Sequence, residues 1–446
     1  MSVRQRARAI AAELASPIQD WRQAWQALSL VERATTIILA IMIVGGVVLR
    51  VRNIGFPPRL TFDEHHFVPN ARHFLLGQAD DNDHPPLGKL FIAVGMLLLG
   101  DNSTGWRAAS LIFGLQTLVI AGALARTLFA DRRAGWFAAA FFAADGFFLS
   151  YSRTALLDCS LTCLVLWSFL AAVTAQTWRG VLACAVLVGL AASVKWSGGV
   201  AVLPAVVAIL VLRRAPRWSL LLFAAAPIVH VALWLAALAL SGQPADPRAL
   251  FTLMHALLRH HIEIGRVPNG LASPWYTWPL LFRPIVVKLA DHGTGHTYAS
   301  SVANPLLFFS ATATILTVLV AGMVAWARAR KARERVATIL VAHLPISPAA
   351  LRAIALLTIG WFAMIAPWTV GRSLGTYMYH YLPSYGFALT LVAGLAAQLE
   401  RRFPRAVLVY VTLVLSIGIF FAPVWAEFPM KEAVAYRRLI FGAWQP

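Results

Sequence analysis

Long, nearly uninterrupted runs of apolar residues recur along most of this 446-residue chain. The first covers residues 34–49 and the last residues 405–424, and charged residues make up only 13% of the sequence. A soluble domain carries about 25% charged residues, and a membrane β-barrel would show alternation instead of runs. The sequence therefore predicts an all-α polytopic membrane protein and excludes a soluble enzyme, a disordered chain and a membrane barrel.

Positively charged residues cluster in short segments between the apolar runs. Lys and Arg number 38 against 19 Asp and Glu, which gives a formal net charge of +19. Such clusters mark cytoplasmic loops of membrane proteins, so the excess charge does not indicate binding to nucleic acid. If the short run at residues 90–99 lies at the interface, every basic cluster falls on the side of the N-terminus. We therefore expect about eleven transmembrane helices and a cytoplasmic N-terminus.

This topology divides the chain into three regions. Residues 1–33 form a cytoplasmic N-terminal amphipathic segment, residues 34–424 the transmembrane domain, and residues 425–446 an external C-terminal tail. Two long external loops are expected at about residues 51–105 and 241–303. Both loops are rich in Trp, His, Pro and charge. Chemistry in a membrane enzyme needs water-accessible polar groups, so we expect the functional site on these loops.

The first external loop contains two motifs that could carry chemistry. Asp63 and Glu64 are adjacent, and neighbouring helical residues point about 100° apart, so they are not expected to share a proton. One could act as a general base for a hydroxyl, or the pair could simply start a helix. His84 and Pro85 open the run HPPLGK, a rigid turn into an interfacial helix. Lys89 would then meet a phosphate at headgroup level or reach water.

Two further cations fall at the external ends of predicted spans. Arg153 either pairs with Asp158, five residues later, or binds a lipid phosphate through its guanidinium fork. Lys195 interrupts an apolar stretch, and a Lys at membrane depth costs about 2.5–3.5 kcal/mol. We therefore expect Lys195 to face a cavity or a partner, and the sequence leaves both roles of Arg153 open.

Aromatic residues gather at two other external positions. Tyr379 and His380 directly precede a late span, and Trp275, Trp278 and Arg283 lie in a proline-stiffened part of the second loop. Such segments suit contact with a sugar or a lipid, and they also suit plain interfacial anchoring.

No metal site is predicted. His292 and His296 have the spacing of a zinc pair, but Gly293 and Gly295 argue against a helix between them. The acidic run at residues 80–83 is more simply a hydrated turn, and we assign it no role. The sequence implies no required cofactor and leaves a divalent cation open.

Taken in chain order, these segments resemble the protein O-mannosyltransferase family, the dolichyl-phosphate-mannose-dependent enzymes of GT-C fold. Each motif is weak alone, whereas the ordered set is specific and covers most of the chain after residue 50. The second loop has about 60 residues, with no room for the lumenal MIR domain of eukaryotic members, so the chain resembles a bacterial member. The matching segments are Phe62-Asp63-Glu64, residues 84–89, Trp106-Arg107, Ser152-Arg153, Leu156-Leu157-Asp158, Ser193-Val194-Lys195-Trp196, Ser273 to Pro284, Asn304-Pro305 and Tyr379-His380-Tyr381-Leu382-Pro383.

The resemblance implies transfer of mannose from a polyprenyl-phosphate-mannose donor to Ser or Thr hydroxyls of proteins, with inversion, at the outer face of the plasma membrane. By match to the family's Asp-Glu motif, Asp63 would be the general base, and Glu64 would help to position the acceptor or the sugar. The expected ligands of the donor phosphate are Arg153, Lys195, Lys89, His380 and Tyr379. The expected substrate-loop residues are His84, Pro85, Trp275, Trp278 and Arg283.

Two other functions stay open at this point. A GT-C enzyme with a lipid or glycan acceptor, similar to the aminoarabinose transferases of lipid A, would keep the same scaffold. A lipid or solute transporter would place charges at the bilayer midplane in repeated halves, whereas the polar groups here collect on one face. For the mannosyltransferase, the expected partners are the donor lipid, secreted acceptor proteins and the surrounding membrane lipids, and no nucleic acid.

Overall fold

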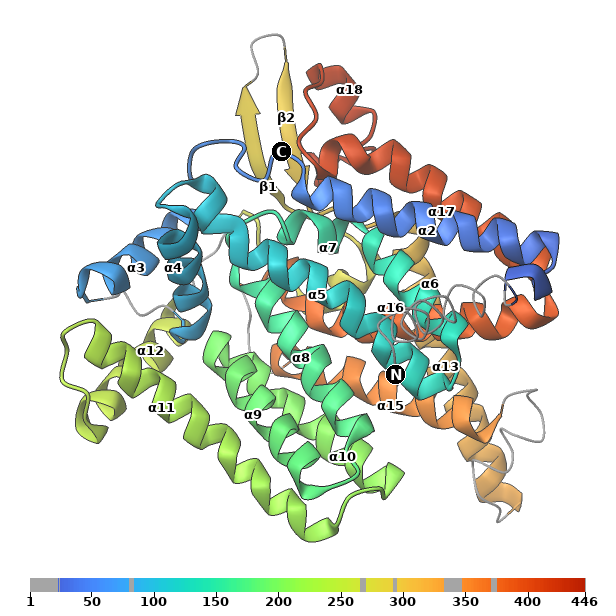
Figure 1. Ribbon diagram of the computed structural model, residues 1–446, viewed down its shortest axis with the longest axis horizontal. Coiled ribbons are helices and arrows are strands. Elements are labelled where there is room, and N and C mark those ends of the chain that lie inside the picture. The colour runs from blue at the N-terminus through green and yellow to red at the C-terminus, as the bar shows by residue number, and fades with distance from the viewer. Residues whose placement is uncertain are drawn as a thin grey trace, which may run out of the picture.

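Helices make up most of the residues that the computed structural model describes (Figure 1), namely residues 23, 25–79, 84–264, 270–291, 295–332, 347–369 and 375–445. The α-helices are α2 (Leu30–Val51), α3 (Glu64–Leu76), α4 (Leu87–Leu99), α5 (Ser103–Phe129), α6 (Arg132–Ala143), α7 (Gly146–Tyr151), α8 (Leu157–Thr174), α9 (Trp178–Val194), α10 (Val202–Leu212), α11 (Ala225–Leu240), α12 (Pro247–Ile264), α13 (Pro305–Ala332), α15 (Pro348–Ile365), α16 (Leu382–Arg402), α17 (Pro404–Trp425) and α18 (Glu432–Tyr436). The 3-10 helices are η1 (Trp196–Ala201), η2 (Arg217–Ala224), η3 (Trp275–Leu280), η4 (Ala366–Thr369), η5 (Met378–Tyr381) and η6 (Gly442–Trp444).

Eight helical segments of the described chain are long and apolar enough to cross a membrane. They are α2, α5, α8, α13 and α17, together with α11, α15 and α16 and their adjoining 3-10 turns. The other three predicted spans are shorter: α9 has 17 residues, η1 and α10 together cover Trp196–Leu212, and the run at 135–150 is divided between α6 and α7. The protein is thus a multi-span membrane protein, and the number of eleven spans stays a prediction.

The first span shows how local sequence sets a helix and its packing. A capping box starts α2, with the Ser29 and Glu32 side chains each accepting from the other residue's backbone N–H. Further along, Gly46 brings α2 against α6, because a Cβ there would lie only 2.4 Å from the carbonyl oxygen of Ala143. Arg50 closes the same contact by donating to that carbonyl oxygen at 3.1 Å. The close approach therefore depends on the missing side chain.

Helix α16 lies in the middle of the bundle and is among its most buried helices, packed against α5, α6, α8, α13 and α15 (Figure 1). At its C-terminal end, Glu400 pairs with Arg133, and Arg401 lies 2.8 Å from Asp131. These pairs join α16 to the start of α6. They lie at the end of the bundle where the basic clusters predict the cytoplasmic side.

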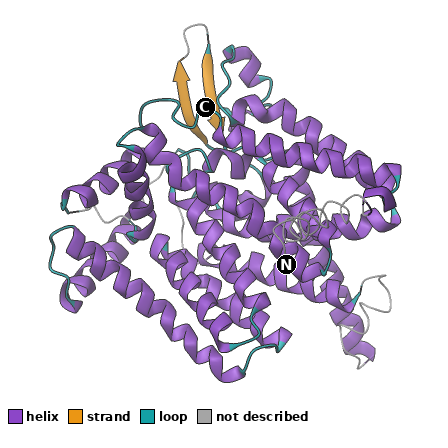
Figure 2. Ribbon diagram, in the orientation of Figure 1, coloured by secondary structure: helices purple, strands orange, loops and turns teal. Residues whose placement is uncertain are grey.

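The second long loop, at about residues 241–303, contains an element that the sequence analysis did not expect. Strands β1 (Val286–Asp291) and β2 (His296–Ser300) form an antiparallel hairpin, the only strands in the described residues (Figure 2). The C-terminal tail folds back onto this loop. His296 forms a β-bridge with Met430, and the indole Nε1 of Trp444 donates to the carbonyl oxygen of Leu281 at 2.9 Å. The tail is therefore part of the folded domain.

Candidate active site

The start of α3 holds the two acidic residues of the first loop in very different surroundings. Phe62 adopts a left-handed backbone conformation, with φ of 47°, which is strained for a residue with a side chain. Glu64 clamps this turn: its Oε2 accepts from the backbone N–H and the hydroxyl of Thr61, at 3.0 and 2.9 Å. Asp63 lies between Phe62 and Glu64 in the sequence. It is half-buried at the N-cap position of α3, where its side chain makes no capping hydrogen bond.

The carboxylate of Glu64 is fully buried and saturated with donors. Arg107 contacts both of its oxygens, at 2.8 and 2.9 Å, and the backbone N–H of Ala155 donates to Oε1 at 2.9 Å. Burial opposes ionisation, but the hydrogen bonds and charge of Arg107 outweigh it and hold the pKa of Glu64 below its ordinary value. This geometry favours a positioning role for Glu64 over direct contact with an acceptor or a sugar.

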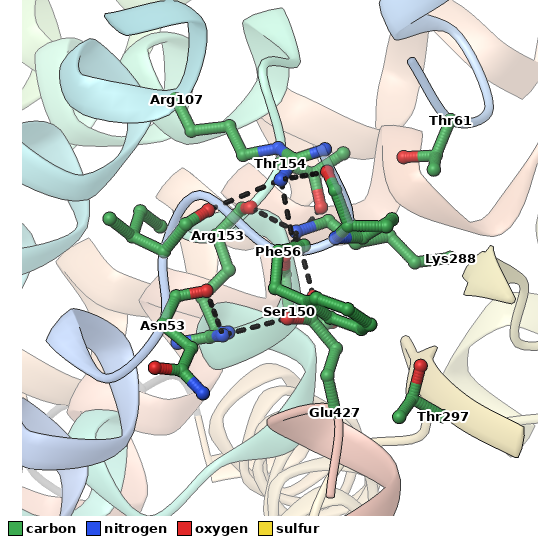
Figure 3. A network of polar contacts seen from close by, with 12 residues as sticks. Asn53, Phe56, Thr61, Arg107, Ser150, Arg153, Thr154, Lys288, Thr297 and Glu427 are labelled. Atoms are coloured by element: carbon green, nitrogen blue, oxygen red, sulfur yellow. Dashed lines mark hydrogen bonds and ion pairs between the residues drawn. The ribbon is translucent and has the colours of Figure 1, made fainter. Parts of the chain in front are cut away.

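Arg153 lies in a second buried network (Figure 3). Its Nη1 donates to carbonyl oxygens of the segment after α2, including that of Arg52 at 2.7 Å, and its Nη2 lies 2.8 Å from Glu427. Lys288 lies 2.7 Å from the same carboxylate and donates to the backbone oxygen of Arg153 at 2.6 Å. Arg153 therefore pairs with a residue of the C-terminal tail, and the alternative pairing with Asp158 is wrong.

The side chain of Tyr379 is the centre of a third cluster. Its ring stacks on Tyr377, with centroids 5.2 Å apart, and meets the edges of Phe62 at 6.2 Å and His380 at 4.5 Å. Asp63 follows Phe62 in the sequence and therefore lies close to this aromatic group. Burial and the negative charge of Asp63 together raise the pKa of Tyr377. Asp63 is also within electrostatic range of Tyr379 itself.

Lys195 also lies close to this ring. Its Nζ is 5.0 Å from the centroid of Tyr379 and 2.8 Å from Oδ1 of Asp158. Lys195 is the C-cap of α9 and Asp158 lies in the first turn of α8, so the ends of two packed helices bring the pair together. The ring of Tyr379 thus lies close both to an acid of the first loop and to a buried cation.

His84 connects the first loop to this cation. Burial lowers the pKa of His84 well below its ordinary value, and the nearby positive charges of Lys195, His261, Lys89 and His380 lower it further. Lys89 is fully buried at the start of α4, 6.0 Å from the ring centroid of Phe74. The predicted residues His84, Lys89, Lys195 and His380 therefore lie near one another, and Pro85 is buried beside them.

The aromatic residues of the second loop border His380. The ring of His380 stacks on the ring of Trp368 in η4, with centroids 3.8 Å apart. The ring centroid of the buried Trp278, in the second loop, lies 6.0 Å from that of His380. Trp275 is half-buried at the start of η3, in edge contact with Tyr276. Arg283 is half-buried in the segment that leads into β1, and no contact places it in the cluster around Tyr379.

No group of three or more His, Cys, Asp or Glu side chains that could hold a metal ion occurs within the described part of the chain. His296 pairs with Asp291 across the hairpin at 2.7 Å. His292 and the acidic run at 80–83 lie outside the described residues. A requirement for a divalent cation stays open.

The structure therefore separates the predicted site residues into two groups. Asp63, His84, Lys89, Lys195, Tyr379 and His380 gather at the ends of α3, α4, α9 and α16, whereas Glu64 and Arg153 belong to buried networks that hold the backbone. The sequence analysis did not assign site roles to Asp158 and His261, which face this place from α8 and α12, or to the network residues Arg107, Lys288 and Glu427.

Solved structures of two membrane glycosyltransferases share this fold. The Saccharomyces cerevisiae protein O-mannosyltransferase Pmt1-Pmt2 complex bound to the sugar donor aligns with a TM-score of 0.74 at 12% identity, covering 92% of this chain and 93% of that one. ArnT from Cupriavidus metallidurans bound to undecaprenyl phosphate aligns with a TM-score of 0.54 at 15% identity, covering 90% and 77%. The fold is that of the GT-C membrane glycosyltransferases.

Sequence comparison identifies the family within this class of glycosyltransferases to which the chain is related. Residues 83–241 match the family model of dolichyl-phosphate-mannose-protein mannosyltransferase, and residues 248–443 match the C-terminal four TMM region of protein-O-mannosyltransferase. The chain belongs to the protein O-mannosyltransferase family and is a mannosyltransferase. A polyprenol-phosphate-mannose–protein mannosyltransferase of Mycolicibacterium smegmatis is 24% identical, covering 89% of this chain and 90% of that protein. One from Mycobacterium tuberculosis is 31% identical over 172 residues, 31% of this chain and 33% of its own length.

Proposed function

We propose that the protein transfers mannose from a polyprenyl-phosphate-mannose donor to Ser or Thr hydroxyls of acceptor proteins, at the extracytoplasmic face of the plasma membrane and with inversion. The observation that carries this proposal is that Asp63 and Lys195 both lie close to the ring of Tyr379. A hydroxyl acceptor needs a base on one side of the anomeric carbon, and the departing phosphate needs cations on the other. The cluster offers both.

Asp63 is the proposed general base. In one displacement, the acceptor oxygen bonds to the anomeric carbon, the bond from that carbon to the phosphate oxygen breaks, and the hydroxyl proton passes to the Asp63 carboxylate. The adjacent acid is unsuited to this task, because Glu64 already accepts five hydrogen bonds and is held ionised by Arg107. A single displacement inverts the centre without a covalent sugar–enzyme intermediate.

The departing polyprenyl phosphate gains negative charge and needs no proton donor if cations face it. Lys195 and Lys89 are the proposed cations, and His84, His380 and Tyr379 supply further N–H and O–H groups. Both lysines are almost completely buried, so their charges act in a poorly hydrated place where electrostatic stabilisation is stronger than in water.

Glu64, Arg107 and Arg153 are proposed as positioning residues. Arg107 donates to Glu64 and to backbone carbonyl oxygens between residues 54 and 59, including that of Phe56 at 2.9 Å. Arg153 fixes the preceding segment through the carbonyl oxygens of residues 49, 50 and 52. Together they hold the turn that presents Asp63, and a phosphate would have to displace these bonds to reach either guanidinium.

The experiment is transfer of mannose from polyprenyl-phosphate-mannose to a Ser/Thr-rich peptide by the purified protein. Asp63→Asn is expected to lower kcat by about 10²–10⁴, the usual contribution of a general base. Asp101→Asn is the matched control, since Asp101 is a part-exposed carboxylate of the same loop that pairs with Arg72. Asp63→Asn with unchanged transfer would remove Asp63 as the base, and comparison of the anomeric configuration of the mannose in the donor and in the product would test inversion.

A lipid or glycan acceptor is the second candidate function, and the shared fold with ArnT is the observation behind it. That likeness shows the fold alone, whereas both family matches concern protein mannosyltransferases. Mass spectrometry of a deletion strain separates the two. Loss of hexose from Ser/Thr peptides of secreted proteins supports the protein acceptor, and altered glycolipids with intact glycoproteins support the other.

A further inference from the structure

Helix α12 of the second external loop brings a histidine to the candidate active site. Leu257 is buried on α12 and packs against Trp234 and Leu238 of α11. His261 lies four residues further on, so it shares the same inward face of the helix. The sequence places two other histidines on α12, His255 and His260, and both are exposed.

The ring of His261 contacts two segments that flank proposed phosphate ligands. It lies 5.3 Å from the ring of His84, which opens the turn leading to Lys89. It also lies 5.7 Å from the ring of Trp196, the residue next to Lys195. Since α12 lies close to the start of α4 (Figure 1), the face of α12 that carries His261 borders the same place.

The adjoining face of α12, roughly 100° around the helix from Leu257 and His261, is apolar and exposed. Phe251, Leu258 and Ile262 are spaced seven and four residues apart and form one stripe on its surface. In a membrane protein such a stripe faces hydrocarbon chains. Helix α12 therefore has one face toward the lipid and another toward the buried cations, which is the arrangement that a ligand with an apolar tail and an anionic head requires.

We propose that His261 binds the phosphate of the polyprenyl carrier together with His84, and that α12 forms the wall of the donor site that faces the lipid. This inference rests on the proposed function for the identity of the carrier. An imidazole N–H is a suitable donor to a phosphate oxygen, whether the ring is neutral or protonated. His261 is thus a donor-binding residue, and the proton of the acceptor hydroxyl still passes to Asp63.

Binding of undecaprenyl phosphate to the full-length protein in lipid nanodiscs tests the proposal without any transfer reaction. His261→Ala is expected to weaken this binding about 10- to 100-fold, the loss of one hydrogen bond to a charged group. His261→Gln retains an N–H donor and is expected to recover part of the loss. His255→Ala, an exposed histidine of the same helix, is the matched control and is expected to leave the affinity unchanged.

Kinetics of transfer provide the second readout. His261→Ala is expected to raise the KM for polyprenyl-phosphate-mannose and to leave the KM for the acceptor peptide unchanged. A normal donor affinity in both His261→Ala and His261→Gln, or a rise in the peptide KM instead, would overturn the proposal. A wild-type protein that binds undecaprenyl phosphate but transfers no mannose would refute the proposed function alone. A wild-type protein that transfers mannose with a donor affinity independent of His261 would refute this inference alone.

Discussion

Glu427 faces two buried cations, so removal of its charge is expected to destabilise the fold more than removal of one cation. Its carboxylate lies 2.8 Å from Arg153 Nη2 and 2.7 Å from Lys288 Nζ, and none of the three side chains is more than 1% exposed. Removing one partner of a buried ion pair costs about 3–5 kcal/mol. Because Glu427→Gln leaves two cations without a counter-charge, we expect a loss in the upper part of that range.

Lys288→Met is expected to cost less, because Glu427 keeps its pair with Arg153. The variant loses the hydrogen bond from Lys288 Nζ to the backbone oxygen of Arg153, at 2.6 Å, and we expect a loss of about 1–2 kcal/mol. The double variant leaves only one cation unpaired, so it is expected to be more stable than Glu427→Gln alone. Unfolding in mixed SDS micelles, followed by tryptophan fluorescence, gives the four free energies of this cycle. Equal losses in the two single variants, or simple additivity in the double variant, would refute the pairing.

The pH dependence of the free energy of unfolding tests the same network. Burial lowers the pKa of Lys288 from 10.5 to about 8, and the charge of Glu427 offsets this only in part. Between these two values the unfolded chain holds a proton that the folded protein has released, so the free energy of unfolding contributed by this group rises with pH. The difference in stability between the wild type and Lys288→Met should therefore shift in favour of the wild type over this window. A pH-independent difference would show that Lys288 is not titrating there.

Two other predictions concern stability at acidic pH and the packing of α2 on α6. Glu64→Gln is expected to lower the melting temperature near neutral pH, because Arg107 loses its charged partner, and the gap to the wild type should narrow below about pH 4. The sign follows from the lowered pKa of Glu64, whose stabilising contribution is present above its ordinary value and lost as the pH falls through the folded-state value. Gly46→Ala is expected to cost about 1–3 kcal/mol, because its Cβ would meet the backbone oxygen of Ala143 at 2.4 Å. Gly45→Ala is the control, with no atom within 4 Å of the added Cβ, and equal melting temperatures for the two variants would contradict the packing of α2 on α6.

The helical framework was predictable because a bilayer leaves the backbone few choices. Every peptide group within hydrocarbon must be satisfied inside its own segment, so each long apolar run predicts a helix. The hairpin was not predictable in the same way. Strands β1 and β2 have only six and five residues. Such a short alternation of apolar and polar residues within a polar loop does not distinguish a strand from a turn. The return of the C-terminal tail onto β2 also depends on contacts between distant segments, such as the bridge of His296 to Met430.

Several residues of the candidate site could be named from the sequence, whereas the residues with which they pair could not. Asp63, His84 and Lys195 could be named because charged and polar residues beside apolar runs need a reason to be there. Their partners depend on the fold: Lys195 meets Asp158 of a neighbouring helix, and Arg153 meets a carboxylate 274 residues away. His261 could not be singled out, since no local pattern distinguishes it from the other histidines of α12.

Hydrogen bonding makes Glu64 the less suitable of the two adjacent acids for taking a proton. Glu64 is fixed by donors from Thr61, Arg107 and Ala155, so protonation would break several contacts at once and its low pKa makes it a poor base. Asp63 is half-buried, its side chain makes no capping hydrogen bond, and it lies close to the aromatic group around Tyr379. Glu64 thus holds the strained turn at residue 62, and this turn positions Asp63, the proposed general base.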